Sequence, residues 1–292
     1  MHRLRASRRG GGAAPPPEPL GGLRGIWGRP YVDLTPYVDT SGFAAIDEEI
    51  SLALAVVPTS YTGGSHKSMG IVPPSLEDEP YVDYGQVIDA MSDADFARFV
   101  SLSDEPEAFD LGRRRAYQFG EERAHPLSRR QMRWLVYRYG VYFPWKVFVE
   151  LVPNRWWGEK STGAGKSFTR QARAFFPRTV AWVERLPFAE IGRCTIMGLE
   201  ANDHGTVHHD GDPADPHPPD HFVAVCPKGD KRLFLWEEET RTKTPVTSRA
   251  YWFNDQDDHG VDADPFFRYS IRVDGVFDGD FLARVRAGHG AT

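Results

Sequence analysis

Residues 222–236, FVAVCPKGDKRLFLW, hold two apolar runs that the turn Lys228-Gly229-Asp230 separates. Valine, phenylalanine and leucine at this density, between turn-forming residues, are typical of β-strands. The same texture begins near residue 191 and continues toward the C-terminus, with further runs at 194–199, 250–253 and 266–273. Many short strands at this spacing predict a β-sandwich or barrel.

The first half of the chain has a different pattern. Residues 44–56 and 87–102 carry apolar residues at helical spacing, Ser128 is a candidate helix N-cap, and Pro177 suits a first helical position. Residues 145–152, WKVFVELV, are the one clear strand there. We therefore predict a mainly β fold with helical support. Residues 25–292 would form a single catalytic domain, with a helical or mixed substrate region at 25–190 and a metal-binding β core at 191–280.

Residues 1–24 are rich in arginine, glycine and proline. Glycine and proline runs at 10–12 and 15–17 would break an amphipathic helix, so we predict a disordered tail. The whole chain has 292 residues and a formal net charge of −6, which argues against nucleic acid as its main partner. No stretch approaches the ~20 apolar residues of a membrane span, so no membrane partner is predicted. Two cysteines, Cys194 and Cys226, favour a reducing, cytoplasmic location.

The residues that indicate chemistry lie in the β-rich half. His208 and Asp210 form an H-x-D pair, and residues i and i+2 of a strand point to the same side. His259 follows 49 residues after Asp210, a gap that fits several short strands returning beside the first pair. Two imidazoles and one carboxylate form the facial triad of Fe(II) oxygenases. Because zinc hydrolases use the same residue types, the triad alone does not decide the reaction.

Arg268 lies nine residues after His259. A dicarboxylate co-substrate that chelates iron at one end needs a cation for its distal carboxylate, and the arginine fork suits that task. Ser270, two residues on, could add a hydroxyl hydrogen bond from the same side of the strand. Arg272 is the competing cation, because it lies on that side as well.

Residues 176–276, roughly a third of the chain, resemble the aspartyl/asparaginyl β-hydroxylase-like 2-oxoglutarate oxygenases. The matching segments are Phe176-Pro177-Arg178-Thr179, RCTIMGL at 193–199, His208-x-Asp210, HFVAVCPKGDK at 221–231, ETRT at 239–242, Phe253-Asn254-Asp255, His259, and Arg268 ahead of Val273-Asp274.

This resemblance implies a double-stranded β-helix (a jelly-roll, cupin-like core), an Fe(II) cofactor, O2, and turnover of 2-oxoglutarate to succinate and carbon dioxide. It also adds His221, which matches a family histidine that helps to hold a co-substrate carboxylate. The substrate it implies is an amino acid, an amino-acid-derived small molecule or a peptidyl residue, hydroxylated at a C–H bond. Since Asp210 is present, halogenation is disfavoured.

Several other interpretations remain open. His208, Asp210 and His259 could belong to a polar loop and a structural histidine, or to a metal-binding β-barrel that acts as a sensor or scaffold without catalysis. Residues 160–167 imitate a phosphate-binding loop, although Lys160 stands where the pattern needs glycine. Arg155, Trp156 and Trp157 could line a substrate entrance or pack at the edge of the sheet.

Overall fold

The computed structural model describes residues 20, 22–59, 84–119, 124–141, 143, 146–154, 157–210 and 217–290. Most of the predicted tail, residues 1–24, lies outside these described residues. The elements, in chain order, are β1 (Tyr31–Asp33), α1 (Phe43–Leu54), α2 (Tyr84–Asp89), α3 (Asp93–Ser101), η3 (Pro106–Ala108), η4 (Leu111–Ala116), α4 (Arg129–Tyr139), β2 (Val147–Val152), η5 (Trp157–Glu159), α5 (Arg170–Phe175), α6 (Pro177–Val183), β3 (Phe188–Leu199), β4 (Gly205–His208), β5 (Phe222–Val225), β6 (Leu233–Glu237), β7 (Thr242–Pro245), β8 (Ala250–Phe253), β9 (His259–Val261), β10 (Arg268–Phe277) and α7 (Gly279–Gly288).

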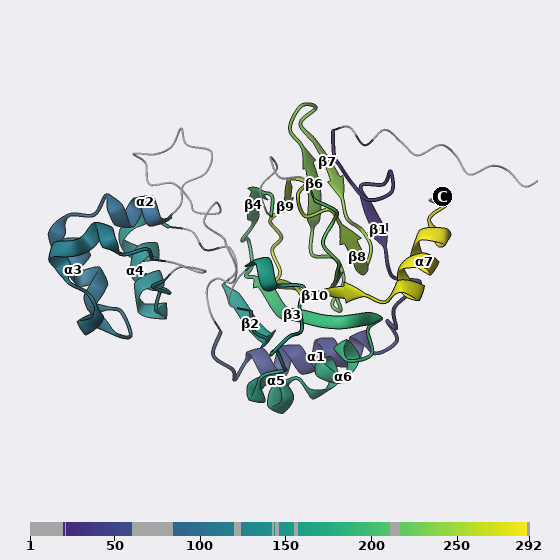
Figure 1. Ribbon diagram of the computed structural model, residues 1–292, viewed down its shortest axis with the longest axis horizontal. Coiled ribbons are helices and arrows are strands. Elements are labelled where there is room, and N and C mark those ends of the chain that lie inside the picture. Colours follow the sequence, from purple (N-terminus) through teal and green to yellow (C-terminus); the bar gives the residue numbers. More distant parts are fainter. Residues whose placement is uncertain are drawn as a thin grey trace, which may run out of the picture.

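The described strands form two antiparallel sheets (Figure 1). The larger sheet has the order β1-β8-β5-β10-β3-β2, and the smaller has the order β4-β9-β6-β7. Between β3 and β10 the chain passes repeatedly from one sheet to the other, so that four of these eight strands lie in each sheet. This is the arrangement of a double-sheet jelly roll. The prediction of a mainly β fold with helical support is confirmed.

One face of the larger sheet is turned toward the smaller sheet. Cross-strand partners share a face, so Arg272 of β10 lies on the same side as its partners Ala224 of β5 and Thr195 of β3. This side is the interior of the jelly roll, because the Arg272 guanidinium reaches Asp210, which lies just beyond β4. Residues two positions apart on β10 therefore also face the interior.

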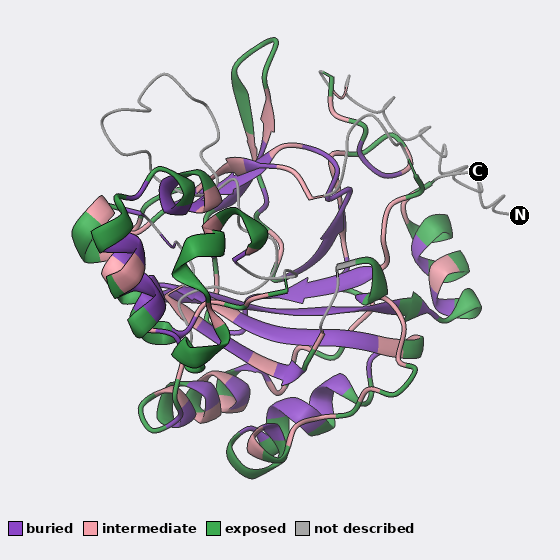
Figure 2. Cartoon of the chain, turned by 60° about the vertical axis from the view of Figure 1, so that its left-hand side comes forward, coloured by how far each residue is buried: buried purple, intermediate pink, exposed green. Residues whose placement is uncertain are grey.

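Helices cover the opposite face of the larger sheet. Helices α1, α5 and α6 lie beneath β2 and β3 in Figure 1, and α7 lies at the far end of β10. Tyr269, on the outer side of β10, donates from its hydroxyl to Asp47 of α1 at 2.8 Å. Burial by helices on one side and by the smaller sheet on the other makes β10 buried along most of its length (Figure 2). Its sequence nevertheless alternates, with Arg268, Ser270 and Arg272 on the interior side and the apolar Tyr269, Ile271 and Val273 on the other side.

A separate hydrophobic cluster lies in the helical lobe of α2, α3 and α4, between residues 84 and 143. The apolar pattern at 87–102 is divided there between α2 and α3, because Ser92 caps α3 by accepting from the Asp95 amide. Ser128 caps α4 as predicted, in a capping box with Gln131. Within the described residues, every helix is too short or too polar to cross a bilayer. The single-domain division of 25–292 stays a prediction.

Candidate metal centre

The structure brings His208, Asp210 and His259 together at one end of the smaller sheet. One potential ligand atom from each residue lies within 4.8 Å of the other two. His208 ends β4 and His259 begins β9, and the two residues are cross-strand partners. Their ring centroids are 4.4 Å apart. Asp210 follows β4, and its backbone amide donates to the Asp255 carbonyl at 2.7 Å, which fixes the turn that carries the carboxylate.

Both imidazoles are oriented by backbone carbonyls. Nδ1 of His208 donates to the Thr206 carbonyl at 2.8 Å, and Nδ1 of His259 donates to the Asp257 carbonyl at 2.9 Å. Because a carbonyl only accepts, Nδ1 carries the proton in the neutral ring. Nε2 is then the unprotonated nitrogen, and Nε2 of His208 lies 3.9 Å from an Asp210 carboxylate oxygen. Metal-ligating histidines in proteins are commonly held in this tautomer.

The charge states of the cluster suit a divalent cation. Burial is the main cause that lowers the pKa of His259 to about 3, and the nearby His208 lowers it further. Burial acts to raise the pKa of Asp210, but the neighbouring His259, Arg272 and His208 hold it below its usual value. Near neutral pH the site therefore offers a carboxylate and a neutral His259 imidazole, the forms that bind metal.

We expect the metal-free protein to lose stability as pH falls from about 6.5 toward 4. The unfolded chain protonates His259 at its ordinary pKa near 6.5, whereas the folded protein keeps it neutral down to about 3. The unfolded state therefore binds more protons in this window, so the free energy of unfolding rises with pH. Urea unfolding midpoints at several pH values measure this slope. A His259→Asn variant should have a shallower slope, and an equal slope in both proteins would contradict the assignment.

Asp210 is held by a network of buried charged side chains centred on Arg272. Arg272 donates to Asp210 at 3.2 Å, to Asp255 at 2.6 Å and to Asp274 at 2.8 Å. Lys160 pairs with the same Asp255 carboxylate at 2.9 Å. Arg272 therefore holds the carboxylate of Asp210 and the loop at Asp255 in one arrangement, and it lies over the ring of Phe222, 4.0 Å from the centroid.

Lys160 and Lys166, the two lysines of the phosphate-loop-like segment, both contact groups within the fold. Lys160 is buried and pairs also with Asp220 at 2.8 Å. Lys166 donates to the Asn154 side chain at 2.6 Å and to the Glu159 carbonyl. The following helix, α5, begins only at Arg170. These contacts describe a segment held against the jelly roll and give no support to a nucleotide site.

Arg268 lies in a different environment from the one that a carboxylate clamp needs. Within the part of the chain that the structure describes, its guanidinium donates to backbone carbonyls alone, at distances of 2.8–3.3 Å. The acceptors lie in the segments that precede β4, β6 and β10, namely Asp203, Lys231, Asp262, Asp264 and Phe266. Such contacts indicate that Arg268 joins loops, and a bound carboxylate would have to replace some of them.

His221 lies on the outer side of the larger sheet. Its Nδ1 accepts from the Phe277 amide at 3.1 Å, and its ring stacks on that of Phe277 with centroids 4.7 Å apart. Trp252 of β8 contacts the His221 ring edge-on. The next residue of β8, Phe253, contacts the His259 ring in the interior of the jelly roll. Successive residues of a strand face opposite sides, so the structure does not bring His221 to the metal cluster.

The remaining predicted residues have mixed positions. Ser270 is buried on the interior side of β10, where its hydroxyl accepts from the Lys231 amine at 2.6 Å. Lys231 was not among the predicted site residues, because it follows an apparent turn in the sequence. Arg155 and Trp156 lie outside the described residues, and for Trp157 only the backbone of η5 is described. Their role at a substrate entrance stays a prediction.

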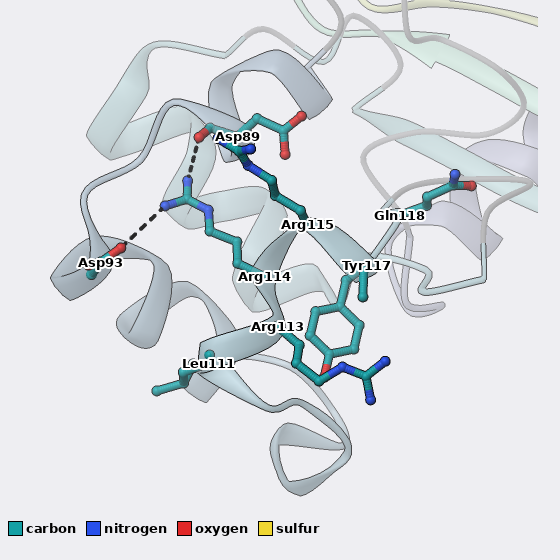
Figure 3. A pocket seen from close by; sticks show the side chains of 10 residues that line it. Asp89, Asp93, Leu111, Arg113, Arg114, Arg115, Tyr117 and Gln118 are labelled. Carbon is teal, nitrogen blue, oxygen red and sulfur yellow. Dashed lines mark hydrogen bonds and ion pairs between the residues drawn. The ribbon is translucent and has the colours of Figure 1, made fainter.

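An open hollow of about 1120 Å³ lies in the helical lobe, lined by residues of 89–118 (Figure 3). Arg114 there donates to the carbonyls of Met91 at 2.5 Å and Asp89 at 2.8 Å. Figure 3 shows Arg114 directed toward Asp89 and Asp93, with Arg113 extending away from them beside Tyr117. The hollow is formed by the lobe itself, and no residue of the metal cluster lines it.

Comparisons with known proteins find similar structures but no similar sequence. No family model matches the sequence, and no curated protein matches it. Among solved structures, the chain is similar to a viral collagen prolyl hydroxylase of Paramecium bursaria Chlorella virus-1, with 10% identity over 44% of this chain and 77% of that chain, at a TM-score of 0.24. A Pseudomonas putida prolyl-4-hydroxylase shares 13% identity over 37% and 65%, at a TM-score of 0.23. Dioxygenase for auxin oxidation 1 from Arabidopsis thaliana shares 13% identity over 83% and 81%, at 0.29. These values are too low to bear on function, which has to follow from the geometry of the site.

Proposed function

We propose that the protein is an Fe(II)- and 2-oxoglutarate-dependent dioxygenase that hydroxylates a C–H bond of an amino acid, an amino-acid-derived small molecule or a peptidyl residue. The observation that carries the proposal is the cluster of His208, Asp210 and His259 at the end of a jelly roll. The class of substrate rests on the sequence resemblance to the aspartyl/asparaginyl β-hydroxylase-like oxygenases.

The donor set fits an iron(II) ion. Two imidazole nitrogens and one carboxylate converge from one side, and three protein ligands leave adjacent coordination positions open. Each imidazole is fixed by a backbone carbonyl, as expected for a ligand whose Nε2 binds metal. Iron bound there with 2-oxoglutarate would supply the oxidation of a C–H bond by dioxygen, with succinate and carbon dioxide as the co-products.

The chain's own residues orient the ligands and keep water out. Arg272 fixes the Asp210 carboxylate in place through a hydrogen bond of 3.2 Å. Phe253 packs edge-on against the His259 ring, with centroids 4.9 Å apart, and Leu235 is the buried cross-strand partner of His259. Apolar groups beside the ligands lower the local dielectric and limit the access of bulk water, which protects an oxidising centre from side reactions.

The first test is an anaerobic titration of Fe(II)-loaded protein with 2-oxoglutarate. We expect a weak visible charge-transfer band to appear, because the 2-oxo acid would chelate iron through the open positions. A His259→Ala variant should lose the band, whereas His289→Ala, which changes a histidine near the end of the chain, should keep it. Absence of the band in folded, iron-loaded wild-type protein would favour the alternative, a metal-binding β-barrel without catalysis.

A further inference from the structure

Lys231 is a buried amine in the interior of the jelly roll. It precedes β6 of the smaller sheet, is 5% exposed, and donates through Nζ to Ser270 on β10 of the larger sheet at 2.6 Å. The amine therefore crosses the space between the two sheets. Ser270 is two residues before Arg272, so both side chains face this space, and Arg272 contacts the candidate metal ligand Asp210.

The surroundings of Lys231 favour an anion. Burial is the main cause that lowers the pKa of this amine to about 7, and Arg272 and Arg268 lower it further through their positive charges. Cys226, which faces the amine, has a pKa raised to about 11 by burial and stays neutral near pH 7. A carboxylate in this region would stabilise the protonated amine and offset the repulsion from the two guanidinium groups.

The two arginines are less suited than Lys231 to receive a new carboxylate. Arg272 already contacts three aspartates, and loss of any of these contacts would leave a buried carboxylate less well paired. Arg268 contacts five backbone carbonyls, whose alternative partners are few in a buried position. The Lys231 amine, in contrast, donates to a neutral hydroxyl that can itself donate to a carboxylate oxygen.

A second observation also points into this space. The Thr195 hydroxyl is fully buried and finds no hydrogen-bond partner among the described residues. Thr195 is the cross-strand partner of Arg272 on β3 and a diagonal neighbour of Ser270, so it shares the interior face with both. Buried hydroxyls in proteins are usually paired, so the Thr195 hydroxyl can take a hydrogen bond from water or from a bound molecule.

We propose that Lys231 and Ser270, with Thr195 beside them, form the seat for the distal carboxylate of a five-carbon 2-oxo diacid. The seat rests on the proposed function, because the same molecule would bind metal through its 2-oxo acid end. Two residues of strand, about 7 Å, separate Ser270 from Arg272, which contacts Asp210. Arg272 therefore links the face that holds Ser270 to the metal cluster. In this seat Lys231, rather than Arg268, is the group that selects 2-oxoglutarate.

The experiment compares two ligands that differ only at the distal end. Mn(II)-loaded protein is titrated calorimetrically with 2-oxoglutarate and with 2-oxopentanoate, which has the same chain length but lacks the distal carboxylate. A Lys231→Met variant should bind 2-oxoglutarate at least about tenfold more weakly, as expected for loss of a hydrogen bond to a charged group. Its affinity for 2-oxopentanoate should stay within about twofold of wild type, since that ligand makes no such bond. Lys228→Met, a change at an exposed lysine on the same turn, is the matched control and should leave both affinities unchanged.

Each outcome separates the seat from the proposed function. Normal 2-oxoglutarate binding by Lys231→Met, or an equal loss for both ligands, overturns the seat while the oxygenase proposal stands. Wild-type protein that binds Mn(II) but neither 2-oxo acid overturns the proposed function and the seat with it. If Lys231→Met fails to fold, Ser270→Ala and Thr195→Val provide the test, because each should weaken binding of 2-oxoglutarate alone.

Discussion

An Asp210→Ala variant should bind Fe(II) at least about 100-fold more weakly than wild-type protein and should lose 2-oxoglutarate turnover. Changes to residues that only orient a metal ligand typically cost 10–100-fold in affinity, so loss of a ligand itself should exceed that range. Asp210 is also the one anionic group of the cluster, and its carboxylate balances part of the charge of a divalent ion. Anaerobic equilibrium dialysis with Fe(II) measures the affinity, and succinate formation measures the turnover.

The fold should survive this change. Arg272 would keep its contacts to Asp255 and Asp274, so the buried cation is still paired after Asp210 is removed. Asp258→Ala is the matched control, because Asp258 lies next to His259 and pairs with His209 at 2.9 Å outside the cluster. That variant should bind Fe(II) within about threefold of wild type, because the pair is partly exposed to solvent and contributes little. Full iron-dependent turnover by Asp210→Ala would refute the ligand assignment.

The apolar strands could be predicted from the sequence, but the strands that carry the candidate metal ligands could not. Strands β5, β6 and β8 were predicted from the apolar runs at 222–226, 232–236 and 250–253, because buried strands are rich in apolar residues. Strands β4 and β9 are only four and three residues long and lie among polar loops. They are too short to show the alternation of apolar and polar residues that predicts a strand. The candidate ligands were predicted from residue type, and their convergence depends on the pairing of β4 with β9.

Strand alternation predicted that His208 and Asp210 point to the same side, but alternation is not what positions Asp210. Since β4 ends at His208, Asp210 lies beyond the strand, and the hydrogen bond from its amide to Asp255 positions it instead. The positions of the basic side chains inside the jelly roll were also only partly predictable from the sequence. Alternation placed Arg268, Ser270 and Arg272 on one face, but only the folded loops decide which cation contacts carbonyls and which contacts carboxylates. Lys231 becomes part of the interior through the pairing of distant strands, which its local sequence does not reveal.

An Arg272→Met variant should lose about 3–5 kcal/mol of stability. Removal of one partner of a buried ion pair leaves an uncompensated charge, and Arg272 serves three carboxylates, of which Asp255 and Asp274 are almost fully buried. Arg193 and Lys160 would still pair with Asp274 and Asp255, so the loss should stay within that range. Urea unfolding measures the change as a shift of the midpoint at a constant m-value.

The control for this change is an arginine of similar connectivity at the surface. Arg232 contacts Asp264 at 2.9 Å and Asp230 at 3.6 Å, but its side chain is 55% exposed. Water already solvates these charges, so Arg232→Met should cost no more than about 1 kcal/mol. Equal unfolding midpoints for Arg272→Met and wild type would show that the buried network does not stabilise the fold.

The pH dependence gives the Arg272 prediction a second, independent readout. Arg193 and Arg272 hold the pKa of Asp274 below its ordinary value of 3.8, against the opposing effect of burial. A carboxylate with a depressed pKa contributes stability above its unfolded pKa and loses it as pH falls through the folded value. In Arg272→Met the pKa depression is smaller, so the difference in stability from wild type should narrow as pH falls below about 4. A divalent ion bound at Asp210 would supply part of the missing positive charge, so Mn(II) should raise the unfolding midpoint of Arg272→Met but leave that of the Asp210→Ala variant unchanged.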